Sequence, residues 1–310
     1  MSLTGRCQLS RLDLLSPAKP ASSERRWQRL IANKALAVPE LCRQLGRPML
    51  SQWGSRRMLL LLDETGLGNR LRCLQISVSF RRRALPLAWI CYKPDALPAR
   101  QPQLVRRLLR RVAKMLPSPA DVVLLADRGL AWPLLIDWCQ ELGWHFVLRV
   151  QGQSHVLLPD GTNRAIEELA DQPGKHYMGR GEIFQVAGWR AVNIVAVWDH
   201  GQDQPWLLVS DLEPSRQRCR DYSKRMWQEE SFRDDKSHGL NWQDSHVWMP
   251  EHAERLLLGM ALAMWLTITV GVQVVKRAWR RLLDRASRWT LSIFQLGHRW
   301  LERCLYCSRA

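Results

Sequence analysis

The segment DYSKRMWQEESFRDDK carries residues suited to chemistry on a phosphate backbone. Tyr222, Arg225, Glu229 and Lys236 have the spacing Y-x2-R-x3-E-x6-K, which places them along one face of a helix. A carboxylate such as Glu229 can hold a divalent ion. Arg225 can bind a phosphate through a bidentate fork, and Lys236 can bind one as a point charge. The predicted DNA-binding residues of this segment are Tyr222, Arg225 and Lys236.

Two aspartates each follow an apolar run that is typical of a buried strand. Asp63 ends MLLLLD, and Asp127 ends DVVLLAD. If the two strands are neighbours, both carboxylates emerge at one edge of a sheet, where Glu229 can join them. Three converging carboxylates can hold two Mg²⁺ ions about 4 Å apart, with Mn²⁺ as a substitute, and such a pair promotes attack on a phosphodiester. We therefore predict that Asp63, Asp127 and Glu229 are both the catalytic and the metal-binding residues.

The composition of the chain favours a polyanionic partner. Its 310 residues carry a net charge of +17, and most of the cations are arginine. Arginine makes bidentate phosphate contacts, so nucleic acid is favoured over an anionic membrane surface, although a generically basic protein from a GC-rich genome is the alternative. A hydrophobic share of 46% is enough for a core and excludes a disordered chain. Eight scattered cysteines predict reduced thiols in a cytosolic protein.

The elements that must position the acids follow in the order three strands, helix, strand, helix, strand. We expect helices over 101–116 and 130–142, and strands over 58–63, 72–80, 84–92, 121–127 and 144–150. This order predicts an α/β fold with a ribonuclease-H-like mixed sheet flanked by helices. Glycine-rich, β-like pieces over 152–212 predict a β-rich insertion that interrupts the core. A single helix over 219–236 then carries the tyrosine, arginine, glutamate and lysine.

The predicted organisation has four parts. A short helical N-terminal region over 1–54, with one amphipathic helix over 24–48, is a candidate for DNA contact. The catalytic core comprises 55–151 and 213–275, the insertion lies between its halves, and a basic helical tail covers 276–310. Residues 256–275 contain no charge and are long enough to span a membrane. We favour a helix in the protein core, because glycine, threonine and glutamine dilute its apolar character.

The site residues together resemble the DDE transposases of the insertion-sequence-four type, whose mark is the YREK signature. All four signature positions match, and Trp227 fits the RxW pattern that is usual between the arginine and the glutamate. Asp63 in LLLLDETGL and Asp127 in LLADRGL match the two aspartates. The resemblance covers about residues 55–275, and a β-rich insertion before the glutamate is also common in these enzymes.

The resemblance implies a cut-and-paste reaction. Water nicks the transposon end, the freed 3′-hydroxyl forms a hairpin on the opposite strand, and the reopened end is joined to target DNA. The implied partners are double-stranded terminal inverted repeats and target DNA, with a dimer in the DNA complex, no membrane, and a prokaryotic cytoplasm at the nucleoid. In relatives the signature tyrosine and arginine contact hairpin phosphates. A tryptophan of the insertion receives a flipped base there, and the candidates are Trp189, Trp198 and Trp206.

Other interpretations of the same residues stay open. A ribonuclease-H-like nuclease or resolvase would share the acids but would need neither terminal-repeat binding nor strand joining. A non-mobile, transposon-derived DNA-binding protein would be expected to have a broken triad, and here the triad is complete. Each acid alone could be a turn former or a solvated residue, and Glu64, Asp234 and Asp235 are rival acids.

Overall fold

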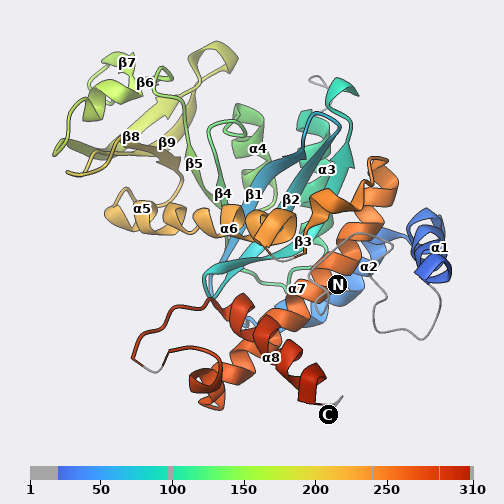
Figure 1. The fold of residues 1–310 in the computed structure, drawn as a ribbon. Coiled ribbons are helices and arrows are strands. Elements are labelled where there is room, and N and C mark those ends of the chain that lie inside the picture. The colour runs from blue at the N-terminus through green and yellow to red at the C-terminus, as the bar shows by residue number, and fades with distance from the viewer. Residues whose placement is uncertain (1–19, 97–100, 239, 286, 308–310) are drawn as a thin grey trace.

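One mixed sheet of ten strands runs through the computed structural model, which describes residues 20–96, 101–238, 240–285 and 287–307 (Figure 1). Its strand order is β3-β2-β1-β4-β5-β10-β9-β8-β6-β7. The strands are β1 (Met58–Leu67), β2 (Leu71–Phe80), β3 (Arg83–Tyr92), β4 (Val122–Ala126), β5 (His145–Arg149), β6 (His155–Leu157), β7 (Asn163–Ala165), β8 (His176–Ile183), β9 (Arg190–Val197) and β10 (Trp206–Ser210). The helices are α1 (Pro20–Ala32), α2 (Val38–Ser51), α3 (Gln101–Ala113), α4 (Pro133–Glu141), α5 (Arg216–Ser223), α6 (Met226–Arg233), α7 (Pro250–Lys276) and α8 (Ile293–Cys307).

The first half of the sheet has the predicted mixed α/β arrangement. Strands β1, β4 and β5 are parallel, while β2 and β3 extend the sheet beyond β1 as an antiparallel meander. Helix α3 connects β3 to β4 and α4 connects β4 to β5, because parallel neighbours require crossover connections. All five residues of β4 are buried, as expected for a strand covered on both faces. The order β3-β2-β1-β4-β5 is consistent with a ribonuclease-H-like domain.

The predicted β-rich insertion joins this sheet instead of forming a sheet of its own. Strand β10 pairs antiparallel with β5, and β9, β8, β6 and β7 follow outward from it. The division of the chain into domains stays a prediction, and its residues 1–19 and 308–310 lie outside the part that the structure describes.

Helices cover both faces of the sheet. Figure 1 shows α5 and α6 crossing one face, with α3 and α4 behind the other. Helix α6 contacts β1 and β3, and α7 contacts β3 together with α1, α2 and α8. Helix α6, which carries Glu229, is therefore held directly against the strand that carries Asp63.

Two helices differ from their predicted extents. The single helix expected over 24–48 is the pair α1 and α2, because Pro39 lies in the first turn of α2 and a proline is tolerated at a helix start. The helix expected over 219–236 is also divided. A tight turn at Lys224–Arg225, where the Arg225 N–H donates to the Tyr222 carbonyl at 2.8 Å, separates α5 from α6. A π-helical turn, Asp234–His238, follows α6.

Helix α7 corresponds to the apolar stretch that could have been a membrane span. Among the described residues it is the one helix long and apolar enough for that role, and half of its most apolar window is buried inside the protein. It packs against β3 and crosses α8 closely. The contacts agree with the predicted core helix.

Two glycines set the close approach of α7 and α8. A Cβ atom added to Gly271 would lie 2.0 Å from the Ile293 carbonyl oxygen, and one added to Gly297 would lie 1.8 Å from the Thr267 carbonyl oxygen. Real Cβ atoms do not come this near to backbone, so any side chain here must push the two helices apart.

We expect Gly297→Ala to destabilise the protein by about 1–3 kcal/mol, because overpacking a backbone contact forces the helices to move. Urea unfolding measures this change. Gly46→Ala is the control, since a Cβ there meets only the flexible end of Met115 at 3.3 Å. A Gly297→Ala protein as stable as its parent would contradict the close crossing.

Candidate active site

The register of β1 and β4 places the two predicted aspartates side by side. The last paired residues of these parallel strands are Leu62 and Ala126, so Asp63 and Asp127 follow at equivalent positions. Residues in register on parallel neighbours point to the same face of a sheet. Asp63 does not end β1, contrary to the sequence prediction, because the strand continues to Leu67 by pairing with β2. The two carboxylates nevertheless emerge together.

Helix α6 carries the third carboxylate, Glu229, and the Arg225 side chain links it to the two aspartates. The Arg225 guanidinium lies 3.1 Å from the Asp63 carboxylate and 3.3 Å from the Asp127 carboxylate through one nitrogen, and 2.5 Å from the Glu229 carboxylate through another. The Arg225 side chain is only 12% exposed. Asp63, Asp127 and Glu229 thus converge, and one buried cation stands between them.

Asp63 is perturbed mainly by its own burial, and the two neighbouring acids add to the effect. Burial raises the pKa of Asp63 to about 6, with further raising by the charges of Asp127 and Glu229, while Arg225 acts in the opposite direction. Burial alone would lower the pKa of Arg225, but the neighbouring carboxylates outweigh it and raise that pKa above its ordinary value. The cluster therefore needs a positive charge at its centre.

The donor set fits a hard divalent ion, because it consists of carboxylate oxygens around a buried position that already holds a cation. In the described parts of the chain, no group of three or more acidic, histidine or cysteine side chains is arranged as a metal site as it stands. The Arg225 guanidinium would have to leave before an ion could bind all three carboxylates.

The other two predicted DNA-binding residues are less accessible than the sequence suggests. Tyr222 is only 5% exposed, and its ring meets that of Trp206 edge-on at 5.3 Å. Burial raises the pKa of its hydroxyl to about 12. Lys236 is half-buried in the π-helical turn, and burial followed by the charge of Arg72 lowers its pKa, against the opposing charge of Asp63. DNA contact by Tyr222, Arg225 and Lys236 stays a prediction.

Two of the rival acids, Glu64 and Asp234, have other partners. Glu64 accepts hydrogen bonds from the Tyr92 hydroxyl and, at 2.6 Å, from the Gln101 amide. Asp234 pairs with Arg83 at 2.8 Å. Glu230, the neighbour of Glu229, pairs with Arg233 at 3.0 Å on the surface of α6.

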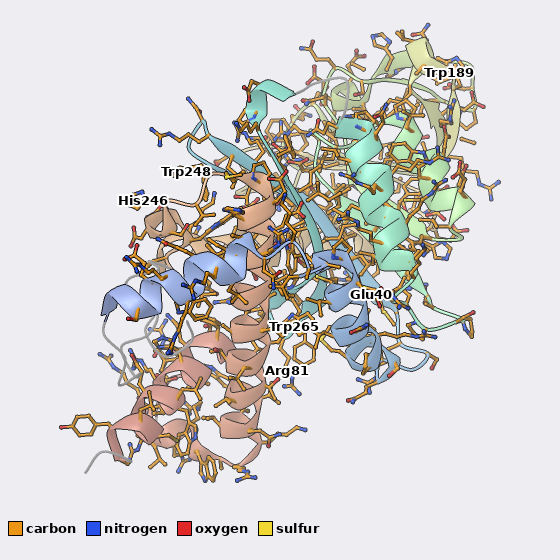
Figure 2. All side chains as sticks on the ribbon, turned by 90° about the vertical axis from the view of Figure 1, so that its right-hand side faces the viewer. Glu40, Arg81, Trp189, His246, Trp248 and Trp265 are labelled. Atoms are coloured by element: carbon orange, nitrogen blue, oxygen red, sulfur yellow. The ribbon has the colours of Figure 1, made fainter. Side chains whose placement is uncertain are left out.

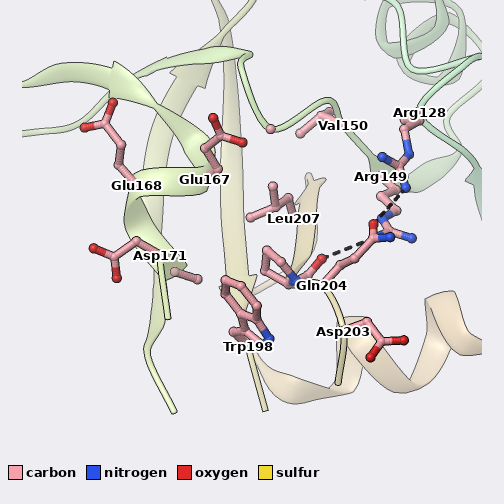
Figure 3. Close-up of a pocket in the computed structure, with 13 residues that line it drawn as sticks. Arg128, Arg149, Val150, Glu167, Glu168, Asp171, Trp198, Asp203, Gln204 and Leu207 are labelled. Atoms are coloured by element: carbon pink, nitrogen blue, oxygen red, sulfur yellow. Dashed lines mark hydrogen bonds between the residues drawn. The ribbon is translucent and has the colours of Figure 1, made fainter. Parts of the chain in front are cut away.

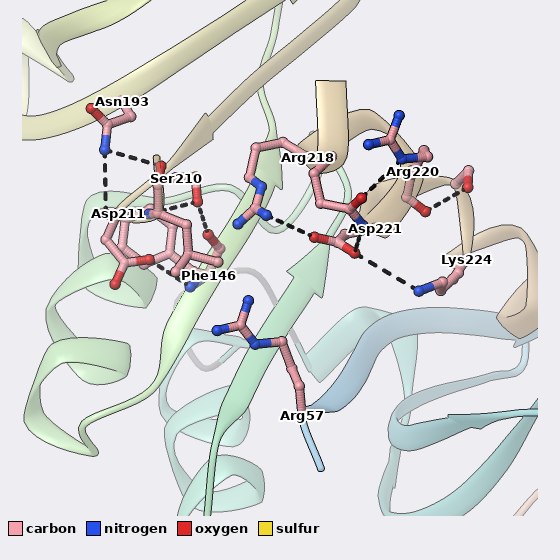
Figure 4. A network of polar contacts seen from close by, with 12 residues as sticks. Arg57, Phe146, Asn193, Ser210, Asp211, Arg218, Arg220, Asp221 and Lys224 are labelled. Carbon is pink, nitrogen blue, oxygen red and sulfur yellow. Dashed lines mark hydrogen bonds and ion pairs between the residues drawn. The ribbon is translucent and has the colours of Figure 1, made fainter. Parts of the chain in front are cut away.

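Figure 4 shows polar contacts within α5 and its C-terminal turn, and a separate set between β10 and β5 on the sheet. Asp221 pairs with Arg218 at 3.3 Å and with Lys224 at 3.8 Å. On the sheet side, the Ser210 hydroxyl donates to the Phe146 carbonyl at 2.6 Å, and Asp211 accepts the Phe146 N–H at 3.0 Å. These contacts join β10 to β5 immediately before the chain enters α5.

A cavity of about 490 Å³ lies between the end of β5 and the segment 152–207 (Figure 3). Arg128, Arg149 and Trp198 are among its lining residues, and Gln204 accepts hydrogen bonds from both arginines at 3.2 and 3.3 Å. Arg149 ends β5, the strand next to β4, and its charge acts on Tyr222. The sequence prediction omitted Arg149, although the rule that selected Asp127 at the end of its strand could have found it.

We expect the stability of the protein to depend on pH through Asp63. A folded-state pKa of about 6, against about 3.9 in an unfolded chain, means that Asp63 contributes stability below about pH 4 and loses it as pH rises through 6. Asp63→Asn removes this loss. As the pH rises from 4.5 to 7.5, the free energy of unfolding of the variant should therefore increase by on the order of 2 kcal/mol relative to that of its parent.

Urea unfolding with EDTA at the two pH values measures that difference. Glu230→Gln, which removes a surface carboxylate of the same helix segment, is the control. An Asp63→Asn difference that does not change with pH would contradict the electrostatic description of the cluster.

Comparisons with known proteins identify a family for this chain. Solved structures offer only weak similarity. The C-terminal lobe of a budding yeast Argonaute has 9% identity and a TM-score of 0.27, covering 84% of this chain and 60% of that one. Kluyveromyces polysporus Argonaute with a guide RNA has 9% identity and a TM-score of 0.20, covering 82% and 34%. No curated protein matches. Residues 99–266, more than half of the chain, match the transposase DDE domain, and the chain belongs to this family.

Proposed function

We propose that this protein is a cut-and-paste DNA transposase of the insertion-sequence-four type, with Asp63, Asp127 and Glu229 as its catalytic acids. The observation that carries the proposal is the convergence of these three carboxylates, from two parallel strands and one helix, around one buried cation. It occurs in a chain of the transposase DDE domain family, which generally uses divalent metals. The spacing of Tyr222, Arg225, Glu229 and Lys236 supports the narrower assignment to the YREK type.

The three carboxylates are the proposed ligands of two Mg²⁺ ions, for which Mn²⁺ can substitute. Bound divalent ions supply Lewis-acid activation of an entering oxygen and charge stabilisation of a leaving one at phosphorus. The protein groups orient the strand and neutralise its charge. Arg225, once released from the acids, can bind a phosphate through its bidentate fork, and Lys236 is placed to add a second positive charge.

The proposed reaction begins with hydrolysis at the transposon end. Water attacks phosphorus and releases a 3′-hydroxyl, which then attacks the opposite strand to give a hairpin. A second hydrolysis reopens the hairpin, and the same 3′-hydroxyl joins target DNA. The proposed partners are terminal inverted repeats and target DNA, with a protein dimer in the DNA complex.

Trp198 is the insertion tryptophan that we propose for stacking a flipped base. It lines the same cavity as Arg128 and Arg149, and the described lining also includes the acidic residues Glu167, Glu168, Asp171 and Asp203 (Figure 3). Trp206 instead packs edge-on against the buried Tyr222. A cavity that offers an indole ring and two arginines can hold a nucleotide, since the base could stack on Trp198 while an arginine neutralises the phosphate.

Each of Asp63→Asn, Asp127→Asn and Glu229→Gln should abolish DNA cleavage while leaving DNA binding within about threefold, because the acids act on the reacting phosphate and not on the remaining backbone. The assay uses Mg²⁺ and end-labelled DNA that carries the inverted repeats flanking the gene. Hairpin ends and target insertion distinguish a transposase from a nuclease, which would cut without joining. Glu230→Gln is the control, and normal cleavage by Glu229→Gln would refute the assignment of the third acid.

Replacing the central arginine should make the acids bind metal more tightly. In Arg225→Met no guanidinium has to be displaced, so we expect Mn²⁺ to bind at least about tenfold more tightly than in the parent, as measured by electron paramagnetic resonance of free Mn²⁺. Arg83→Met is a matched control, since Arg83 is equally buried, at 12%, in its pair with Asp234. Equal Mn²⁺ affinities of Arg225→Met and its parent would show that Arg225 and the metal do not compete.

A further inference from the structure

A second cavity, of about 640 Å³, lies away from the three acids. It is bounded by the C-terminal end of α2, the turn between β2 and β3, the start of α6 and the C-terminal half of α7. Figure 2 labels Arg81 and Trp265, two of its lining residues, beside α7. None of Asp63, Asp127, Arg225 and Glu229 lines it.

The cavity is strongly cationic. Its described lining includes Arg56, Arg81, Lys224 and Lys276 but no acidic residue. In the part of the chain that the structure describes, Arg56, Arg81 and Lys276 are exposed and form no ion pair with an acid, whereas Lys224 lies 3.8 Å from Asp221. A concave surface with three uncompensated cations attracts a phosphate group.

Aromatic rings supply the rest of the recognition surface. Trp53, Phe80, Trp227 and Trp265 line the same cavity, and each is half-buried and therefore keeps part of its ring surface available. The rings of Trp53 and Phe80 are 5.7 Å apart and tilted by 58°. Cations interleaved with aromatic rings form the combination that holds single-stranded nucleic acid, because the rings stack on bases while the cations follow the backbone.

The backbone at Arg81 is strained in a way that keeps this cation at the cavity. Arg81 and Arg82 form the two-residue turn between β2 and β3, with φ angles of 47° and 66°. Such a turn strongly prefers asparagine and glycine, because other side chains are disfavoured at positive φ. The Arg81 guanidinium lies over the Phe80 ring at 5.8 Å.

We propose that this cavity binds an unpaired DNA nucleotide, with the phosphate held by Arg81 and Lys276 and the base stacked on the aromatic rings. The volume lies within the range of pockets that enclose small ligands. Duplex DNA would present phosphates but no free base faces, so four aromatic rings along one cavity favour an unpaired nucleotide over a paired one. The inference rests on the proposed function, because it takes DNA as the substrate.

The test measures binding of fluorescein-labelled dT12 and of a 12-base-pair duplex by anisotropy, with EDTA present so that no strand is cut. Arg81→Gly removes the cavity cation and also relieves the positive φ, so the fold should be retained. We expect Arg81→Gly to bind dT12 about 5- to 10-fold more weakly, with a smaller effect on the duplex, and its salt slope for dT12 should fall by about 0.7.

Arg82→Gly is the matched control, because Arg82 has the same strain and charge but does not line the cavity. It should bind dT12 with the affinity of the parent. Lys276→Gln provides a second cavity variant at the exposed end of α7 and should weaken dT12 binding as Arg81→Gly does.

Parent-like binding of dT12 by both Arg81→Gly and Lys276→Gln would overturn the proposal while leaving the proposed transposase function intact. Equal losses in Arg81→Gly and Arg82→Gly would also overturn it, since a general loss of charge would then explain the effect. A parent protein that binds neither dT12 nor the duplex would instead refute the DNA-directed function on which the inference rests.

Discussion

The contact between Arg225, whose side chain is only 12% exposed, and three carboxylates is the interaction on which the candidate site depends. Asp63 and Asp127 come from neighbouring strands and Glu229 from the helix that covers them, so mutual repulsion would separate these elements without a cation between them. A charge pair that is taken out of water costs free energy unless its geometry is good, and here one guanidinium serves all three acids.

The fold supports this contact through register and helix placement. The parallel pairing of β1 and β4 sets the two aspartates next to each other, and α6 lies against β1 and β3. Ser231 on α6 accepts a hydrogen bond from the Ala84 N–H of β3 at 2.9 Å, and Asp234 pairs with Arg83. These contacts fix the helix that carries Arg225 and Glu229 relative to the strands that carry the other two acids.

Much of the core could be predicted from the sequence, because apolar runs that end in an acid identify buried strands and their edge. The inward direction of the Arg225 side chain could not be predicted, because it depends on how α6 lies against the sheet and not on residue spacing alone. The burial of Tyr222 under Trp206 also depends on tertiary packing. Likewise, the antiparallel pairing of β10 with β5, which extends the core sheet into the insertion, has no local sequence signal. Arg149 could have been found by the same reasoning about strand ends, which was applied only to acidic residues.

The central claim is that Asp63, Asp127 and Glu229 share divalent ions once Arg225 has moved away. Anomalous diffraction from crystals grown with Mn²⁺ and a DNA end tests it most directly, because it locates the ion independently of activity. The account predicts manganese density among these three carboxylates, with the Arg225 guanidinium displaced from them. Manganese bound at another place, or a guanidinium still bridging the three acids in a complex that is competent for cleavage, would contradict it.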